Sequence, residues 1–382
     1  MKIEEATKDQ ITRNVILSLF IYLLPIALMF ASFWITGQLR GKRKSIKKKM
    51  QNHQPTKTRK TMEATIEFFR KIIGNLNGIG FPFLVFSIGI LEVIFGLYKG
   101  KWPKNERWVD ISCFILPRLV VQPAVAYFSL KFLPFILPDA KNVFSWVPFF
   151  WGFIIIAVAD DLTQYWYHRL HHQIPWLWRF HRTHHSASYM GMAMASRQNV
   201  IYTIFFSQIY LTAALVYLGL GIPAIAVRII KSTITTLAHS SIPWDKPLYK
   251  YRVLNPLAWV LERLISTPAT HHAHHAATTD DGVGHYKGNF GNMFFLWDVI
   301  FGTALISRKY PKAYGISHYA GDQWTAQLLW PIFKSKVEGS ELAPNGPMVR
   351  IEDDYEALAQ RDKAKVKTVT PKRDLQPSHS NN

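Results

Sequence analysis

Residues 153–185 read FIIIAVADDLTQYWYHRLHHQIPWLWRFHRTHH, an apolar run that passes into histidines without a turn signal. If the run continues as one helix, His168 and His172 are four residues apart and face the same way. His171 lies three residues after His168 and is an alternative to His172. The stretch therefore predicts a helix that delivers at least two imidazoles to one place at its carboxyl end.

Two further histidine clusters share the pattern H-x-x-H-H, which presents three imidazoles from one helical face. They are His181, His184 and His185, and His271, His274 and His275. A single pair at helical spacing is ordinarily a surface or capping feature, but three such clusters beside apolar runs indicate a metal site. Eight imidazoles exceed the about six ligands that one first-row ion takes, so two ions are expected. His239 is a plausible ninth ligand and His285 a weaker candidate.

Composition limits the kind of metal site. The chain of 382 residues has one cysteine, Cys113, which excludes an internal disulfide framework, a cysteine zinc site and a cysteine-held iron–sulfur cluster. Cys113 itself is expected to be a small apolar side chain. The net charge of +20 lies mainly between and after apolar runs, as beside anionic lipid, and no nucleic-acid-binding motif accompanies it.

The apolar residues fall into long runs, which predicts an all-α, multi-pass integral membrane bundle. The runs are Val15–Gln38, Gly78–Tyr98, Val109–Phe135, Val143–Ala159 and Val200–Leu237. The predicted organisation is an anchor and basic loop (1–60), additional membrane helices (61–142), a catalytic unit (143–306) and a disordered polar tail (334–382). Glu92 is expected near the membrane edge, with the bundle interior as the alternative.

The histidine clusters must share one membrane face. Only eight residues separate His172 from His181, too few to cross a bilayer. The third cluster returns to the same face if Val200–Leu237 is a helical hairpin kinked near Gly219–Pro223. Nearby basic residues predict that this face is cytoplasmic. Val109–Phe135 either crosses once or forms two short helices that dip in and return. The histidines share the face of the basic loop only if this stretch re-enters or lies in the interface.

The order of these motifs resembles the fatty acid hydroxylase/sterol desaturase superfamily over roughly Asp161 to Thr303. The matching stretches are Asp161-x-x-x-Tyr165-x-x-His168-Arg, Pro175-Trp-Leu-Trp-Arg-Phe-His181-x-x-His184-His185-Ser, Thr267-Pro-x-x-His271-x-x-His274-His275, Asn289-Phe-Gly291 and Trp297-Asp298-Val-Ile-Phe301-Gly302-Thr. The resemblance implies a helical membrane enzyme with a non-haem two-metal centre that uses O₂ and a partner's electrons against unactivated C–H bonds. The family spacing to His181 favours His172 over His171.

Two carboxylates are expected to support the ligands. Asp161 lies two helical turns before His168 on nearly the same face, where it could accept the second ring N–H of a ligating histidine. Asp298 is the other expected support, with a helix-end cap or an ion pair as the alternative.

These observations predict a di-iron enzyme that hydroxylates or desaturates a lipid, with zinc as a substitute metal. The absence of a nucleotide or flavin motif predicts an external electron donor, such as a cytochrome b5-like protein or a ferredoxin with its reductase. The alternatives are a histidine-rich metal transporter and a membrane protein that only retains metal. A transporter would spread polar residues along a path through the membrane, whereas the histidines here gather at helix ends.

Overall fold

The computed structural model describes Glu92, residues 104–205, 207–317, 319 and 321–347. The predicted spans at Val15–Gln38 and, apart from Glu92, Gly78–Tyr98 lie outside the described residues, and the division of the chain at residues 60 and 142 stays a prediction. The described part is helical and contains, besides helices and loops, one isolated β-bridge between Ala276 and Tyr314.

The first rod of the bundle is continuous. It consists of α4 (Lys104–Cys113), the π-helix η2 (Phe114–Val121) and α5 (Gln122–Ile136). Pro117 lies inside η2, where the wider turn accommodates a residue that donates no backbone N–H. Exposed Phe128, Phe132 and Phe135 face outward from α5. Glu106–Ile136 is long and apolar enough to cross a membrane. Of the two alternatives for this stretch, one continuous rod is therefore found and not two short helices.

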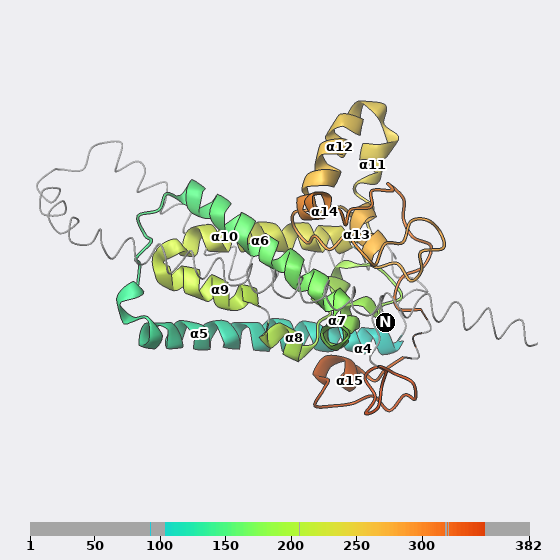
Figure 1. The fold of residues 1–382 in the computed structure, drawn as a ribbon, viewed down its shortest axis with the longest axis horizontal. Helices are drawn as coiled ribbons and strands as arrows, with labels where there is room; N and C mark the ends of the chain where they lie inside the picture. Colours follow the sequence, from blue (N-terminus) through green and yellow to red (C-terminus); the bar gives the residue numbers. More distant parts are fainter. Residues whose placement is uncertain (1–91, 93–103, 206, 318, 320, 348–382) are drawn as a thin grey trace, which may run out of the picture.

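The second rod, α6 (Phe149–Gln173), changes character along its length. Its first half exposes Phe150, Trp151 and Ile155, as expected for a surface in contact with lipid. From Asp160 to His172 nearly every residue is buried. The turn η3 (Pro138–Ala140) follows the first rod, and α6 then runs obliquely back, so that α6 ends near α4 at the same end of the bundle (Figure 1).

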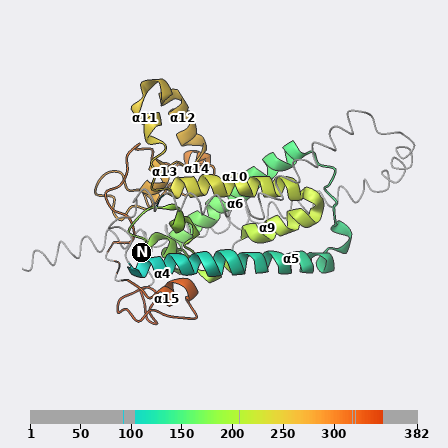
Figure 2. The same cartoon turned by 180° about the vertical axis from the view of Figure 1, so that it is seen from behind.

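The third and fourth rods form the predicted hairpin. They comprise α8 (Val200–Ile204), α9 (Ser207–Leu215), the π-helix η5 (Val216–Leu220) and α10 (Gly221–His239). Gly219 makes the bend with φ of +96°, a conformation that side chains disfavour. Val200–His239 is the other stretch that could cross a membrane by length and composition. Figure 2 shows α9 folded back beside α10 from the opposite viewpoint.

The remaining elements gather at the end of the bundle where α4, α6 and α10 meet (Figure 1). They are α7 (Pro175–His185), η4 (Met192–Ser196), α11 (Lys246–Lys250), η6 (Arg252–Leu254), α12 (Asn255–Leu264), α13 (Pro268–His274), α14 (Leu296–Phe301) and α15 (Trp324–Leu329).

Two expectations about polar segments are corrected. Glu92 is fully buried, and its carboxylate accepts hydrogen bonds from Met192 N, Ser240 Oγ and Ser241 N at 2.8–3.0 Å. It therefore belongs to the interior, because these donors compensate its desolvation. The predicted disorder from residue 334 is wrong for 334–347, where Leu342 is fully buried; residues 348–382 lie outside the described part.

Candidate metal centre

All nine predicted ligands converge in one buried region. Their ring nitrogens form three overlapping groups in which the candidate ligand atoms lie within 4.8 Å of one another. The groups are His168, His172, His181 and His185; His184, His239, His271 and His275; and His185, His274 and His275. Each imidazole is at most 3% exposed. Four helices, α6, α7, α10 and α13, supply them.

Local sequence explains how the short helices deliver their histidines. Pro175 occupies the first turn of α7 directly after the extended Ile174, which turns the chain sharply back from α6. The rings of His168 and His181 consequently lie 4.7 Å apart between centroids. At the third cluster, Thr267 forms a capping box with Thr270 and Pro268 follows it, so α13 begins at a defined residue.

Backbone carbonyls determine which nitrogen of several rings carries the hydrogen. Nδ1 of His168 donates to Phe290 O, Nδ1 of His274 donates to Gly288 O, and Nδ1 of His239 donates to Thr235 O, each at 2.7 Å. A carbonyl only accepts, so in the neutral rings Nε2 keeps its lone pair. The Nε2 atoms of His168 and His274 nevertheless lie 3.1 Å apart. Two lone pairs facing each other at this distance repel unless a cation binds them.

The residues fit metal ions on two further observations. The Nε2 atom of His239 lies 2.9 Å from that of His271 and 3.2 Å from that of His184. For tetrahedral zinc, nitrogens about 2.1 Å from the ion would be about 3.4 Å apart, slightly more than these two distances. Both ring nitrogens of His181 and Nε2 of His185 are buried without a hydrogen-bond partner in the described part of the chain. Buried polar atoms are seldom left so, and a metal would satisfy one nitrogen of each ring.

The two carboxylates behave differently from each other. Asp161 was expected to accept a histidine N–H, but Phe290 O takes that role for His168, and the expectation is wrong. Asp161 instead accepts from Phe294 N at 2.8 Å and from Trp297 Nε1 at 3.1 Å, and pairs with Lys231 at 3.2 Å. Two helical turns before His168, Asp161 thus fixes the loop before α14 and does not contact the rings.

Asp298 holds the loop that carries the histidine acceptor. Its carboxylate accepts from the backbone N–H groups of Phe290 and Gly291 at 2.8 and 2.7 Å and from the Thr303 hydroxyl at 2.6 Å. The carboxylate is therefore linked to His168 only through Phe290, and its bond from the Thr303 hydroxyl also ties it to the end of its own helix. Burial raises the pKa of its carboxyl to about 7 against these hydrogen bonds.

Three other histidines do not join the groups. Nδ1 of His171 donates to Tyr167 O at 2.7 Å, and His285 contacts Thr303 O at 3.1 Å. His272 has both ring nitrogens within hydrogen-bond distance of protein atoms, Tyr314 Oη and Ser240 O. The choice of His172 over His171 thus agrees with the geometry, since only His172 has its ring among the others.

Comparison with known proteins identifies part of the chain. The fatty acid hydroxylase family model matches residues 153–303. Residues 153–303 are a fatty acid hydroxylase domain. Alkylglycerol monooxygenase of Homo sapiens is 26% identical over 250 residues, 62% of this chain and 49% of that protein, and the Danio rerio protein is 24% identical over 276 residues, covering 70% and 55%. Ornithine lipid hydroxylase OlsE of Rhizobium tropici is 26% identical over 284 residues, covering 71% and 80%.

The chain therefore spans about half the length of the alkylglycerol monooxygenases that it matches. No solved structure matches it.

Two further residues, Arg197 and Asn289, stabilise the fatty acid hydroxylase domain. Arg197 is fully buried, donates to Thr183 O on α7 at 2.9 Å and pairs with Asp110 on α4 at 3.3 Å and with Glu106. Asn289, at φ of +56°, donates to Thr270 O at the start of α13. Asn289 belongs to the motif Asn289-Phe-Gly291, whereas Arg197, which ties the first rod to α7, belongs to no recognised motif.

Burial keeps the imidazoles of the hydroxylase domain neutral. Loss of solvent, followed by the charges of neighbouring rings, lowers the pKa of the ligand histidines on α7 and α13 well below the ordinary value of 6.5; these are His181, His184, His185, His271, His274 and His275. A metal ligand must offer a free lone pair, so this state is the one that binds an ion.

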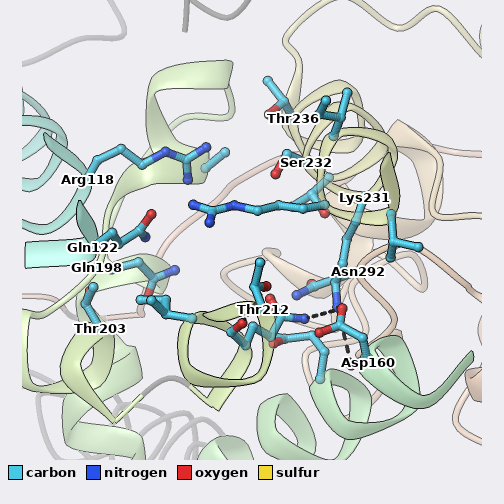
Figure 3. Close-up of a pocket in the computed structure, with 18 of the residues that line it drawn as sticks. Arg118, Gln122, Asp160, Gln198, Thr203, Thr212, Lys231, Ser232, Thr236 and Asn292 are labelled. Atoms are coloured by element: carbon cyan, nitrogen blue, oxygen red, sulfur yellow. Dashed lines mark hydrogen bonds and ion pairs between the residues drawn. The ribbon is translucent and has the colours of Figure 1, made fainter. Parts of the chain in front are cut away.

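A cavity of about 440 Å³ extends from the histidines into the bundle. His168, His181, His184 and His239 line one end of it, and residues of η2, α5, α6, α9 and α10 form its walls. In Figure 3, Arg118 and Gln122 line one wall, and Lys231, Ser232 and Thr236 line the wall opposite. A molecule inside this cavity would have one end at the proposed metal site.

Proposed function

We propose that this chain is a membrane-bound, O₂-dependent lipid hydroxylase whose two iron ions are held by nine histidines. The ligand set is His168, His172, His181, His184, His185, His239, His271, His274 and His275. The observation that carries the proposal is the set of Nε2 lone pairs that face one another at about 3 Å in a buried region. The fatty acid hydroxylase domain and relatives named as lipid hydroxylases support it.

Two bound iron ions would supply the electrons to cleave O₂ and the oxidising power to break an unactivated C–H bond. The chain's own residues do the rest of the work. The carbonyls of Phe290, Gly288 and Thr235 hold the hydrogen on Nδ1 and aim Nε2. The cavity orients the lipid, and the buried surroundings exclude water from the reacting carbon.

We further propose a multi-pass topology with the histidine end at the cytoplasmic face. After the span Glu106–Ile136, α6 returns to that end, and the hairpin Val200–His239 returns there by itself. Exposed Lys246, Lys250 and Arg252 lie in α11 and η6 there, as the positive-inside rule requires. Arg182 does not contribute, because it is buried in ion pairs with Asp322 and Glu341. The electron donor is a cytochrome b5-like protein or a ferredoxin with its reductase.

The alternatives are less well supported. A transporter needs a polar route to both membrane faces, and a protein that only retains metal needs no cavity beside it. Zinc fits the same nitrogens but supplies no electrons. The cavity that ends on four of the histidines favours an enzyme.

The experiment is comparative lipid mass spectrometry of cells that express the wild type or His184→Ala, with iron measured on the purified proteins. The wild type should contain about two irons and give an O₂-dependent hydroxylated lipid that the variant lacks. His285→Ala, which removes a histidine outside the three groups, is the matched control. Identical lipid profiles at equal protein levels would refute the proposal.

A further inference from the structure

The cavity is polar along helices that are otherwise apolar. Starting from the ligand His168 and moving toward the amino end of α6, Gln164 and Asp160 line it at intervals of one turn. On α10 the same pattern precedes His239. Its cavity-lining polar residues are Arg228, Lys231, Ser232, Thr235 and Thr236. Two stripes of hydrogen-bonding side chains thus lead from the histidines into the depth of the bundle.

Two arginines within the candidate spans form no salt bridge in the described part of the chain. Arg118 is half-buried, whereas Arg228 is exposed and is attracted at longer range by the charge of Asp160. Arg118 on η2 and Arg228 on α10 both line the cavity, and their charges repel each other. Neither makes a hydrogen bond or ion pair with another described residue. Figure 3 shows Arg118 reaching inward from its wall. Arginines at such depth are costly and ordinarily mark a binding path.

The nearby carboxylates are already engaged. Asp160 accepts from Lys231 Nζ and from Gln208 Nε2, each at 2.8 Å, and Lys231 also pairs with Asp161. Asp160 lines the cavity, and Asp161 lies beside it through its pair with Lys231. Three cations, Arg118, Arg228 and Lys231, therefore face these two carboxylates, which leaves one positive charge in and beside the walls. The histidines add none while neutral. A ligand with a single negative charge would balance the set.

The side-chain oxygen of Gln164 is a third group that could bind a ligand, because it can accept a hydrogen bond. Gln164 is 3% exposed, and its Oε1 has no partner in the described part of the chain although its residue lines the cavity. It lies one turn, about 6 Å, from His168. Arg228 lies eleven residues before His239 on α10, roughly 16 Å away along the axis. The donor would therefore bind near the histidines and the anion farther from them.

We propose that the cavity binds the polar head group of an anionic lipid, with the anion between Arg118 and Arg228 and a hydroxyl or amine donating to Gln164 Oε1. This inference names the substrate class of the proposed hydroxylase. Oxidation of the bound lipid depends on that proposed function, whereas the binding itself does not. Guanidinium groups suit phosphate and carboxylate because they donate several hydrogen bonds in one plane. The oxidised carbon then lies beside the donor group, close to the histidines, and not at the far end of an acyl tail.

The test is binding of a matched pair of lipids to the purified full chain in detergent, followed by fluorescence or thermal shift. The probes are 1-oleoylglycerol 3-phosphate and 1-oleoylglycerol, which share the oleoyl chain and the 2-hydroxyl and differ in that a phosphate replaces the free 3-hydroxyl. The phosphate lipid should bind at least about tenfold more tightly, and Arg118→Gln or Arg228→Gln should remove most of that preference. Arg118→Lys should keep part of it, which separates loss of charge from misfolding.

Arg252→Gln is the control, because it removes one exposed positive charge outside the cavity. Equal loss of preference in this variant, or equal binding of both lipids by the wild type, would overturn the proposal. Inorganic phosphate that binds as tightly as the phosphate lipid would also overturn it, since the site would then recognise a free anion. Binding needs neither iron nor O₂, so failure of the hydroxylase proposal would show separately in the iron content and the lipid profile.

Discussion

The carboxylate of Asp298 accepts a hydrogen bond of 2.8 Å from the backbone N–H of Phe290. The carbonyl of the same Phe290 accepts the Nδ1 hydrogen of His168 at 2.7 Å. A residue that no metal would touch thus sets the direction in which a ligand points.

Asp298→Asn should therefore weaken iron binding while the protein still folds. The amide is nearly isosteric but replaces one acceptor oxygen with a donor that faces backbone N–H groups. Changes to such supporting residues typically cost about 10–100-fold in metal affinity. Competition with a chelator of known affinity measures the effect. Asp280→Asn, at an exposed site, should leave the affinity unchanged, and the same loss in both variants would count against the argument.

The buried imidazoles predict the pH dependence of metal-free stability. Their pKa values are lower in the folded protein than the ordinary 6.5, so below about pH 6.5 the unfolded chain binds more protons. Stability should be full above this pH and fall as pH decreases from about 7 to 5. Thermal unfolding of chelator-treated protein across this range tests the sign. A midpoint that rises on acidification would contradict it.

Removal of metal should lower the thermal midpoint at neutral pH. On the proposed function, the nine nitrogens would bind metal in the folded state only. Its release would then remove the stabilisation given by mass action, about 4 kcal/mol at a thousandfold excess over the dissociation constant. Added zinc should restore the midpoint but not O₂-dependent product formation, because zinc undergoes no redox change. If zinc left the midpoint of the apo-protein unmoved, the histidines would not be a metal site.

Gly219→Ala should destabilise the second hairpin. Its φ of +96° disfavours any side chain, and an added Cβ would lie 3.0 Å from Asn142 Cα and from Ser145 N. A cost of about 1–3 kcal/mol is expected. Gly221→Ala is the matched control two residues away, where φ is helical and the nearest atoms are 3.6 Å distant. Equal midpoints for the two variants would show that the bend tolerates a side chain.

Sequence patterns were informative where one periodicity dominated. Spacing of three and four residues brought the right histidines together, and the apolar length with Gly219 and Pro223 predicted the hairpin correctly. The prolines of the first rod made a break into two short helices one of two alternatives. In the structure, η2 accommodates Pro117 in a wide turn, and the helix continues. The role of Asp161 was predicted wrongly, because helical spacing shows only that a carboxylate lies near a ring. It cannot show that a backbone carbonyl of the Asn289 loop accepts the ring hydrogen instead.

The polar stripes on α6 and α10 are visible in the sequence but were not recognised as part of a site. Asp160, Gln164 and His168 recur every four residues, and Arg228 and Lys231 share the face of His239 on α10. Each residue alone reads as a tolerated polar group in an apolar run, and only the cavity connects them. Arg197 could not be anticipated, since its partners Asp110 and Glu106 are distant in sequence.

His185 belongs both to the group of His168 and to the group of His274, and His275 is likewise shared between groups. The rings of His185 and His275 lie nearly parallel, 4.3 Å apart. An ion that settles in one group would immobilise rings required by the next, so the second ion should enter a pocket already ordered by the first. Native mass spectrometry during an iron titration should accordingly find mostly empty and doubly loaded protein, with the singly loaded form scarce.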